Sequence, residues 1–559
     1  MSEYKLNNAI AGRNELLFVP LGGCGEIGMN LNLFFYDGKW LMVDLGVSFG
    51  EKLPGIDVVM PDPSFIEERR DNLVGLVLTH GHEDHIGAIP HLWRRLRCPI
   101  YATPFTAALV RRKLDEAGIT REVKLHIIPA GGSFDLAPFS IEYVPMTHSI
   151  VESHALAITT PVGTVLHSGD WKFDPSPQLG AVSNRKRLEE IGKKGVVAMI
   201  GDSTNVFKQG VAGSEADVKT ALFEVVKQAK GRVAIACFAS NVARVQSAAE
   251  AGRAAGRQVA LVGRSMWRID ECARETGYWA KMPHFLSEDD IIDLPPEKVL
   301  MICTGSQGEP RAALARIANG THQRVFVEEG DTVVFSSRII PGNEKEIYHL
   351  QDQLIDRGVH VLSDEDHPGI HVSGHPARDE LLEMMQLVKP LALIPVHGEP
   401  RHLAEHITLA ESAGIKHPVL LHNGEVLKLA PGVPTIIDQV NFGRLALDGN
   451  RLLSDSAKPL QERKRMNESG LAVVTLVIDD AGELIADPSV SLHGLADPAE
   501  VAALVDQISE AVGQSVDEMS PKDVMVDHLV IDRAKTSLRQ VIKRQIGHRP
   551  QVEVHLVRV

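Results

Sequence analysis

The sequence feature that most constrains the fold is the run LTHGHEDHIG at residues 78–87. It contains three histidines and two acidic residues, and it follows an apolar stretch that is typical of a buried strand. Many metal-binding side chains at one strand end indicate a metal centre. Neighbouring side chains at a strand–helix turn point in different directions. The four candidate ligands, His80, His82, Asp84 and His85, are therefore not expected to share one ion. The spacing predicts two ions about 3.5–4 Å apart, one held by His80 and His82, the other by Asp84 and His85.

Each ion needs further ligands, and the ends of other predicted strands supply candidates. His148 (in VPMTHS), Asp170 (in HSGDW) and His397 (in PVHGE) all follow apolar runs. His154 and His167 are rivals for these positions, but both lie inside strand-like runs, and we interpret them as structural.

Composition and charge narrow the class of protein. Hydrophobic residues make up 44% and charged residues 23% of the 559 positions, as in ordinary soluble globular proteins. The polar N-terminus does not resemble a secretory signal, and no apolar stretch is long enough to cross a bilayer. The five cysteines are scattered without a CxxC pair, which argues against a disulfide framework and a cysteine zinc site. We therefore expect a cytoplasmic protein.

The net charge of −15 is weak evidence against nucleic-acid binding, because a local basic groove can lie on an acidic protein. Basic clusters occur at 94–97, 111–113, 184–187 and 461–465. For each cluster alone, a solvated surface is the favoured interpretation.

The pattern of apolar runs predicts several domains. Strand-like segments that end in polar clusters dominate residues 1–215, and this pattern returns over 366–450. Between them, helix-then-strand alternation predicts an α/β module at 216–365. Residues 451–465 are interpreted as a linker. The remaining segment, 466–559, is predicted to contain a helix that begins at Ser520–Pro521 and a closing strand.

The segment GGCGEIGMN contains a formal GxGxxG pattern at residues 23–28. A dinucleotide site requires a helix after the glycines, so that its N-terminus can face the pyrophosphate. Here a β-rich run follows, and we reject the dinucleotide interpretation in favour of a tight turn.

Taken together, the motifs resemble a known family. HGHEDH, with a later histidine and aspartate after strands, resembles the metallo-β-lactamase superfamily. GDSTN, TGSQGEP, SSRIIPGNEKEI, HVSGH and PVHGE, in this order between residues 201 and 399, resemble its β-CASP branch and, within it, the ribonuclease J family. The resemblance covers roughly residues 15–450 and extends to the tail. It implies an α/β protein with a metallo-β-lactamase αββα sandwich, an inserted α/β β-CASP domain and a small α/β C-terminal domain.

The resemblance also assigns roles to residues. His80, His82 and His148 would hold one ion, while Asp84, His85 and His397 would hold the other and Asp170 would bridge them. Besides Asp84, the residues with catalytic roles would be Asp44, which would orient ligands, Asp202 and His371. Imidazole-rich ligation favours Zn²⁺, with Mn²⁺ as the alternative.

The HVSGH loop is a candidate site for an RNA 5′ phosphate. Its hydroxyl, backbone N–H and imidazole donors suit a terminal phosphate, although the same residues also make ordinary turns. The resemblance favours the phosphate site. The predicted phosphate-binding residues are His371, Ser373, Gly374, His375, Ser306 and Arg311.

The predicted function is a metal-dependent ribonuclease that degrades single-stranded RNA 5′→3′, prefers 5′-monophosphate ends and has endonuclease activity as a further expectation. The resemblance also implies a homodimer or homotetramer assembled through residues 466–559, and a role in RNA processing and decay. The alternatives are a β-CASP nuclease acting on DNA, a small-molecule metallo-hydrolase and a non-catalytic RNA-binding scaffold. The large module at 216–365 argues against the small-molecule enzyme, and the complete ligand set argues against the scaffold.

Overall fold

The computed structural model describes residues 14–49, 53–340 and 342–559. Most of the N-terminal segment that we interpret as lacking a secretory signal, residues 1–13, lies outside these ranges. The chain divides into two compact units, residues 1–50 with 58–445 and residues 51–57 with 446–559. Within the described ranges, no helix combines the length and apolarity that a membrane crossing requires.

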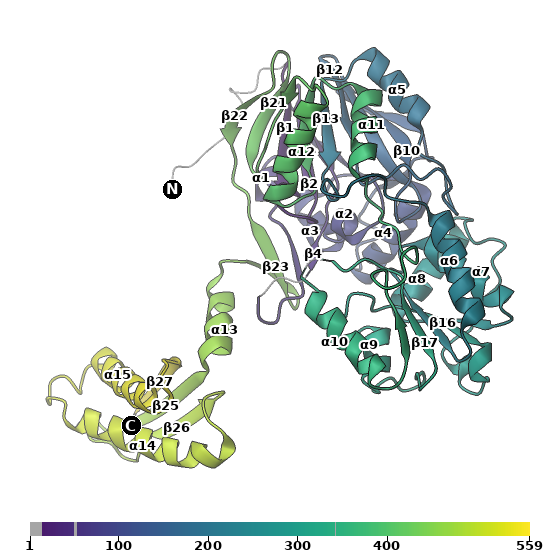
Figure 1. Ribbon diagram of the computed structural model, residues 1–559. Helices are drawn as coiled ribbons and strands as arrows, with labels where there is room; N and C mark the ends of the chain where they lie inside the picture. The colour runs from purple at the N-terminus through teal and green to yellow at the C-terminus, as the bar shows by residue number, and fades with distance from the viewer. Residues whose placement is uncertain (1–13, 50–52, 341) are drawn as a thin grey trace. The chain divides into compact units, whose positions relative to one another are not determined.

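The first unit contains two mixed β-sheets that pack face to face (Figure 1). In order across the first sheet, the strands are β22 (Thr435–Gln439), β21 (Glu425–Ala430), β1 (Leu16–Gly22), β2 (Leu31–Tyr36), β3 (Lys39–Val43), β6 (Leu73–Val77), β7 (Ile100–Ala102) and β8 (Leu125–Ile127). The second sheet consists of β20 (His417–Pro418), β19 (Ala392–Val396), β13 (Ala198–Asp202), β12 (Gly163–His167), β11 (Ser153–Thr160), β10 (Phe139–Met146) and β9 (Ser133–Leu136).

The core between the sheets is apolar. Phe18 and Phe34 from the first sheet pack with Ile158 and Ile200 from the second, and all four side chains are fully buried. Burial of apolar side chains between the two sheets supplies most of the driving force for the sandwich. The short strands β4 (Ser48–Phe49) and β5 (Val58–Pro61) pair with each other.

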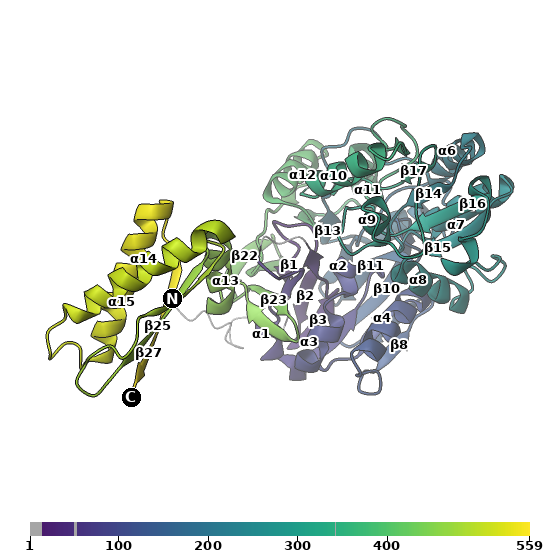
Figure 2. The same cartoon turned by 90° about the horizontal axis from the view of Figure 1, so that it is seen from below.

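Helices cover both outer faces of the sandwich. On the side of the first sheet lie α1 (Ser64–Glu67), α3 (Ile89–Leu96) and α4 (Pro104–Glu116), and the one-turn helix α2 (Glu83–Ile86) follows β6 (Figure 2). On the second sheet, α5 (Arg185–Lys194), α11 (Arg378–Val388) and α12 (Pro400–Ser412) pack their apolar faces. The arrangement is therefore an αββα sandwich.

A second α/β layer is inserted after β13. Its sheet is entirely parallel, in the order β15 (Gln258–Val262), β16 (Val299–Cys303), β14 (Val233–Ala236), β17 (Thr332–Phe335) and β18 (His360–Leu362). The helices are α6 (Glu215–Gln228), α7 (Val242–Ala254), α8 (Arg264–Glu275), α9 (Ala313–Ala318) and α10 (Glu344–Ile355). This inserted domain occupies the stretch for which the sequence predicts a helix–strand module.

The second unit carries a three-stranded sheet, with β25 (Leu471–Ile478) between β26 (Ser489–His493) and β27 (Gln551–Arg558). Helices α14 (Pro498–Asp517) and α15 (Asp527–Ile546) pack on one face of it and enclose an apolar core (Figure 2). The strand β23 (Arg444–Asp448) leads into this unit.

Two local predictions for this region are wrong. The expected linker at 451–465 contains the strand β24 (Arg451–Ser454) and the first two thirds of helix α13 (Lys458–Ser469). The expected helix start at Ser520 is a turn, because the Ser520 hydroxyl accepts the backbone N–H of Asp523 at 3.2 Å and the helix begins only at Asp527. The Ser520–Pro521 pair therefore begins a turn in this chain and not a helix.

Candidate metal centre

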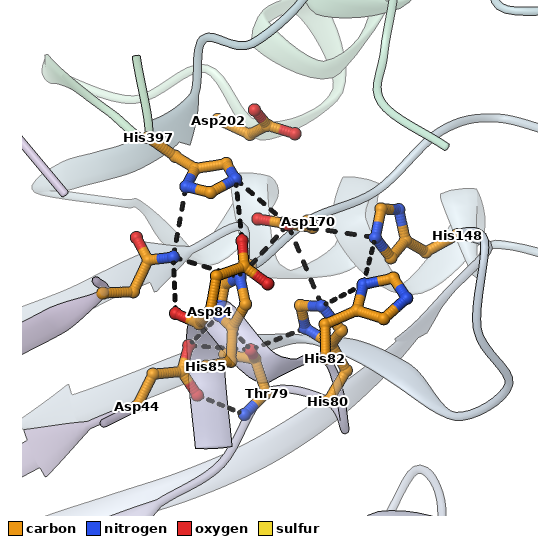
Figure 3. Close-up of polar contacts among 12 residues, drawn as sticks. Asp44, Thr79, His80, His82, Asp84, His85, His148, Asp170, Asp202 and His397 are labelled. Atoms are coloured by element: carbon orange, nitrogen blue, oxygen red, sulfur yellow. Dashed lines mark hydrogen bonds and ion pairs between the residues drawn. The ribbon is translucent and has the colours of Figure 1, made fainter. Parts of the chain in front are cut away.

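The predicted ligands meet at one edge of the sandwich (Figure 3). The loop after β6 carries the first two histidines, and α2 carries the acid–histidine pair. The other ligands follow the ends of β10, β12 and β19 in the second sheet. Because these strands end at the same edge, segments distant in sequence contribute to one site. The seven residues form two groups, His80–His82–His148 and Asp84–His85–Asp170–His397.

The first group consists of three imidazoles. His82 Nδ1 lies 3.1 Å from His80 Nε2 and 3.1 Å from His148 Nε2. The His148 ring is oriented by a hydrogen bond, since its Nδ1 donates to the carbonyl of Gly374 at 2.6 Å, which leaves Nε2 available to a metal ion. Three nitrogens converging in this way fit the donor set of a divalent ion.

The second group combines imidazoles with carboxylates. Asp170 Oδ2 lies 3.1 Å from His85 Nε2 and 3.3 Å from His397 Nε2, while Asp84 Oδ2 lies 3.5 Å from both nitrogens. Asp170 Oδ2 is also 3.8 Å from the first group, at His80 Nε2. One carboxylate thus borders both groups, as a bridging ligand must.

Burial keeps the first group neutral. It lowers the pKa of His82 to about 4 and the pKa of His80 and His148 well below the usual range, an effect that the neighbouring histidines reinforce. A neutral imidazole offers its lone pair to a metal ion without first losing a proton. The first group is therefore prepared for ligation at neutral pH.

The second group pairs two carboxylates with two imidazoles, and each kind of group shifts the pKa of the other. Burial opposes ionisation, but the carboxylates of Asp170 and Asp84 raise the pKa of His397 to about 9 and that of His85 well above its ordinary value. The same histidines lower the pKa of Asp84 and Asp170, against the effect of burial. Carboxylates that hold protons on two imidazoles will also attract a divalent cation, which displaces those protons on binding.

Asp44 supports the second group from behind. Its carboxylate accepts the His85 Nδ1–H at 2.7 Å, the Thr79 backbone N–H at 2.8 Å and the Thr79 hydroxyl at 2.8 Å. This hydrogen bond directs His85 Nε2 toward Asp170. Asp44 and His397 both have positive φ values, 61° and 53°, a conformation that costs energy outside glycine and is often found at functional sites.

Sequence reasoning missed two supporting residues. The Thr79 hydroxyl lies 3.0 Å from His80 Nδ1, so it links both groups to Asp44. Asn30 Nδ2 donates to the Asp84 carbonyl at 3.0 Å and lies 3.1 Å from His397 Nδ1. Neither residue lies in a sequence motif that would distinguish it from an ordinary buried polar residue.

The glycine-rich segment forms a close turn between β1 and β2, and a strand follows it, not a helix. Gly28 has φ 97°, and its backbone N–H points to His397 Nδ1 at 3.4 Å. A Cβ on Gly22 would lie 2.0 Å from the Met29 carbonyl. The glycines therefore allow the backbone to approach the metal centre, a role unrelated to a dinucleotide.

Asp202 lies outside both ligand groups. Its Oδ2 accepts His375 Nδ1–H at 2.8 Å, and its Oδ1 accepts the backbone N–H and hydroxyl of Thr204. His375 in turn lies beside the first group, with His148 and Asp170. Burial lowers the pKa of His375, but the neighbouring carboxylate of Asp202 opposes this effect and the net pKa is raised.

The HVSGH loop adjoins the metal centre. Ser373 Oγ accepts from Asn205 Nδ2 at 2.6 Å and from the His375 backbone N–H at 3.2 Å. A Cβ on Gly374 would lie 2.9 Å from the His148 ring, so only glycine lets the loop approach this ligand. The structure brings Ser373, Gly374 and His375 together with the first group.

The remaining predicted residues lie on other segments. His371 Nδ1 accepts from Arg244 Nη1 at 3.3 Å, and its buried Nε2 has no hydrogen-bond partner in the described part of the chain. Burial and the charge of Arg244 lower the pKa of His371 well below its usual range. Ser306 is buried after β16, where its carbonyl accepts from Gln307, and Arg311 is exposed.

The two rival histidines lie outside the ligand groups. His154 Nδ1 bonds the Glu152 carbonyl at 2.8 Å, and His167 Nε2 lies 3.3 Å from Asn32 Nδ2. Both are buried within the second sheet.

Known proteins are similar to this chain over its whole length. Ribonuclease J of Sinorhizobium meliloti is 42% identical over 100% of both chains. The chain belongs to the ribonuclease J family. Ribonuclease J of Corynebacterium glutamicum is 37% identical over 97% of this chain and 76% of its own, and that of Synechocystis is 36% identical over 96% and 86%.

Family models match successive parts of this ribonuclease J family member. They are the beta-lactamase superfamily domain (49–186), the ribonuclease J beta-CASP domain (230–354), the Zn-dependent metallo-hydrolase RNA specificity domain (367–420) and the ribonuclease J C-terminal domain (459–559). A crystal structure of an Enterococcus faecalis protein of unknown function is similar in fold, with a TM-score of 0.50 and 15% identity over 74% of this chain and all of that one. The predicted family and fold class are confirmed.

Proposed function

We propose that this chain degrades RNA from the 5′ end, using two divalent ions and a pocket for a 5′-terminal monophosphate. Membership of the ribonuclease J family makes the chain a metal-dependent ribonuclease of the metallo-β-lactamase superfamily. The direction of degradation and the end preference are the proposal. One contact carries it: the Gly374 carbonyl accepts from the ligand His148, so the HVSGH loop and the metal centre adjoin.

The ligand groups are suited to two ions. His80, His82 and His148 would hold one ion, Asp84, His85 and His397 the other, and Asp170 would bridge them. The imidazole-rich donors favour Zn²⁺ over Mn²⁺. Bound there, such ions supply Lewis acid polarisation of the phosphate and a water molecule of lowered pKa.

The pocket residues have donors free for a phosphate. Ser373 Oγ already accepts two hydrogen bonds, so its O–H remains available to donate. His375 gives its Nδ1–H to Asp202, which fixes the ring and leaves Nε2 as a second, positively charged donor. With the Gly374 N–H, these donors suit a monophosphate dianion, and a triphosphate would add bulk and charge.

His371 supplies a different kind of donor. Because Arg244 donates to Nδ1, the proton of the neutral ring lies on Nε2, the buried atom without a partner in the described ranges. Its depressed pKa leaves the ring neutral at neutral pH, so it has no imidazolium proton to give as a general acid. We assign it a hydrogen bond to a phosphate oxygen of the substrate. Ser306 and Arg311 would line the path of the RNA.

Other parts of the proposal follow from the family. Internal cleavage would accompany exonuclease activity, in RNA processing and decay in the cytoplasm. Residues 466–559 would join copies of the chain into a dimer or tetramer. DNA as the substrate is the alternative that an assay with matched strands excludes or supports.

The experiment compares the decay of RNA with 5′-monophosphate, triphosphate and hydroxyl ends. We expect the monophosphate to be degraded fastest, because a hydroxyl end leaves desolvated donors unpaired at about 1–3 kcal/mol each. Ser373→Ala together with His375→Ala should reduce the preference while internal cleavage continues. Since His375 adjoins the metal ligands, Ser373→Ala alone is the cleaner variant, and Ser203→Ala, another buried serine, is its control. Full end discrimination in the double variant would place the terminal phosphate elsewhere.

A further inference from the structure

The basic clusters of the sequence are largely neutralised by acids. Each of the three clusters between residues 94 and 187 forms ion pairs, among them Arg94–Glu122, Arg95–Glu67, Arg111–Glu275, Arg112–Glu275, Lys113–Glu83, Arg185–Glu383 and Arg187–Glu142. A cation that is already paired must give up its acid before it contacts a phosphate. Cations outside ion pairs are therefore the better candidates for holding an RNA strand on this acidic protein.

Phe207 exposes an aromatic ring on the loop that follows β13. Phe207 is 49% exposed, whereas the neighbouring Val206 is fully buried. The ring is supported from one side by His402, whose ring centroid lies 5.4 Å away at an interplanar angle of 61°. The guanidinium of Arg401, itself paired with Glu399, lies 6.0 Å from the ring centre. A ring held in this way is oriented in advance for stacking.

In the part of the chain that the structure describes, two cations near Phe207 in the chain or tied to its loop lie outside salt bridges. In the described ranges, the Lys208 ammonium forms no ion pair, and Arg338 uses its guanidinium only for a hydrogen bond to Asn205 Oδ1. Lys208 directly follows Phe207 in the chain, and Arg338 contacts Asn205, two residues before the ring. Burial and the charge of Arg338 lower the pKa of Lys208. Arg338 also lowers the pKa of His402, after burial and Arg401. One cation of the inserted domain and one of the sandwich therefore lie on or against the loop that carries Phe207.

The loop that ends at Phe207 is attached to the proposed site. Thr204 Oγ1 donates to the carbonyl of the ligand His397 at 3.1 Å. Asn205 connects Ser373, through Nδ2, with Arg338, through Oδ1. A nucleotide on Phe207 would therefore belong to a strand that reaches the metal centre.

We propose that Phe207 is a stacking platform for one base of the RNA substrate, with Lys208 and Arg338 contacting the adjoining phosphates. Single-stranded RNA is held by this combination, since every base has a π-face and every linkage a negative charge. The inference uses the proposed function only in taking RNA as the substrate. It does not depend on the 5′-end preference.

The test substitutes the ring in the full-length enzyme. Phe207→Leu keeps an apolar side chain without a π-face and should raise the KM for single-stranded RNA about 5- to 150-fold, with kcat nearly unchanged. Phe207→Tyr should keep the wild-type KM. Hydrolysis of bis(p-nitrophenyl) phosphate, which is too small to reach the platform, should be equal in all three enzymes. Phe326→Leu is the matched control, since Phe326 is 41% exposed and lies under Arg232, a cation that is paired with Glu328.

Substrates with a single abasic site then locate the platform. In the wild type, one abasic position should raise the KM, and in Phe207→Leu that position should no longer matter. A wild-type KM in Phe207→Leu, a defect shared by the tyrosine variant, or an abasic penalty that persists without the ring would overturn the proposal. Loss of bis(p-nitrophenyl) phosphate hydrolysis would also overturn it, because the ring would then act on the metal centre. Absence of a 5′-end preference would contradict the proposed function and leave these results unaffected.

Discussion

Asp44→Asn is expected to remove one metal ion and leave the other. The wild-type carboxylate accepts three hydrogen bonds, two from Thr79 and one from His85. In the variant, the amide oxygen can still accept from the Thr79 backbone N–H, but an amide NH₂ replaces Oδ2. His85 must then accept at Nδ1 and carry its proton on Nε2, the atom 3.1 Å from Asp170 Oδ2. A protonated nitrogen cannot ligate a metal.

The expected loss is about 10- to 100-fold in affinity for the ion held by Asp84, His85 and His397, as for other residues that orient metal-bound histidines. This corresponds to about 1.4–2.7 kcal/mol. The affinity for the ion at His80, His82 and His148 should change much less, since their mutual contacts are retained.

The assay is competition with a chelator, followed by metal analysis of the protein. The wild type should release its ions together, whereas Asp44→Asn should pass through a state with one ion per chain. Asp202→Asn is the matched control, because Asp202 is equally buried and accepts from a histidine outside the two groups. Equal retention of both ions in Asp44→Asn and the wild type would refute the argument that Asp44 sets the tautomer of His85.

Three further predictions concern the metals, the tail and a buried ion pair. His80→Ala or Asp170→Ala should abolish RNA hydrolysis with the circular dichroism spectrum unchanged, and active wild-type enzyme should contain close to two ions per chain; a value near zero would contradict the site. Deletion of residues 458–559, which removes the whole of α13, should lower the mass measured by light scattering from that of a dimer or tetramer to that of a monomer. A monomeric mass for both proteins would refute assembly through the tail. Glu215→Gln should lower the free energy of unfolding by about 3–5 kcal/mol at pH 7 in urea titrations, because it leaves the buried Arg244 unpaired.

The pH dependence of the Glu215 effect has a defined sign. Burial raises the pKa of Glu215, but Arg244 outweighs it and the net pKa is lowered from 4.5. A depressed carboxyl pKa gives stability that is fully present above the unfolded value and is lost as the pH falls through the folded value. The difference between wild type and Glu215→Gln should therefore narrow below about pH 4.5. A difference that stays constant down to the acid transition would contradict the assigned pair.

The candidate metal ligands could be predicted from the sequence because each of them lies in a local pattern. Each follows an apolar run, and strand ends in a sandwich meet at one edge, so His148, Asp170 and His397 could be grouped with the HGHEDH run. Thr79 and Asn30 could not be found in this way. Their roles arise from contacts with segments that are distant in the sequence. The residues next to them in the chain give no sign of these roles.

Where local patterns have two structural solutions, sequence reasoning assigned the wrong one or none. Ser520–Pro521 fits a helix start and a turn equally well, and the chain forms the turn. The catalytic role of Asp202 stays a prediction, and the structure adds that its carboxylate accepts hydrogen bonds from Thr204 and His375. Phe207 follows GDSTN without any spacing that signals a role, and only its exposure beside Lys208 and Arg338 identifies it.

The most direct test of the central claim uses RNA and DNA of the same sequence, each with a labelled 5′-monophosphate, incubated with the enzyme with and without chelator. The account predicts that labelled mononucleotide is the first product from RNA, that matched DNA is degraded far more slowly, and that chelation stops the reaction until Zn²⁺ or Mn²⁺ is restored. Activity that survives complete removal of metal, or release of the label only in long fragments, would contradict a metal-dependent enzyme that degrades RNA from its 5′ end.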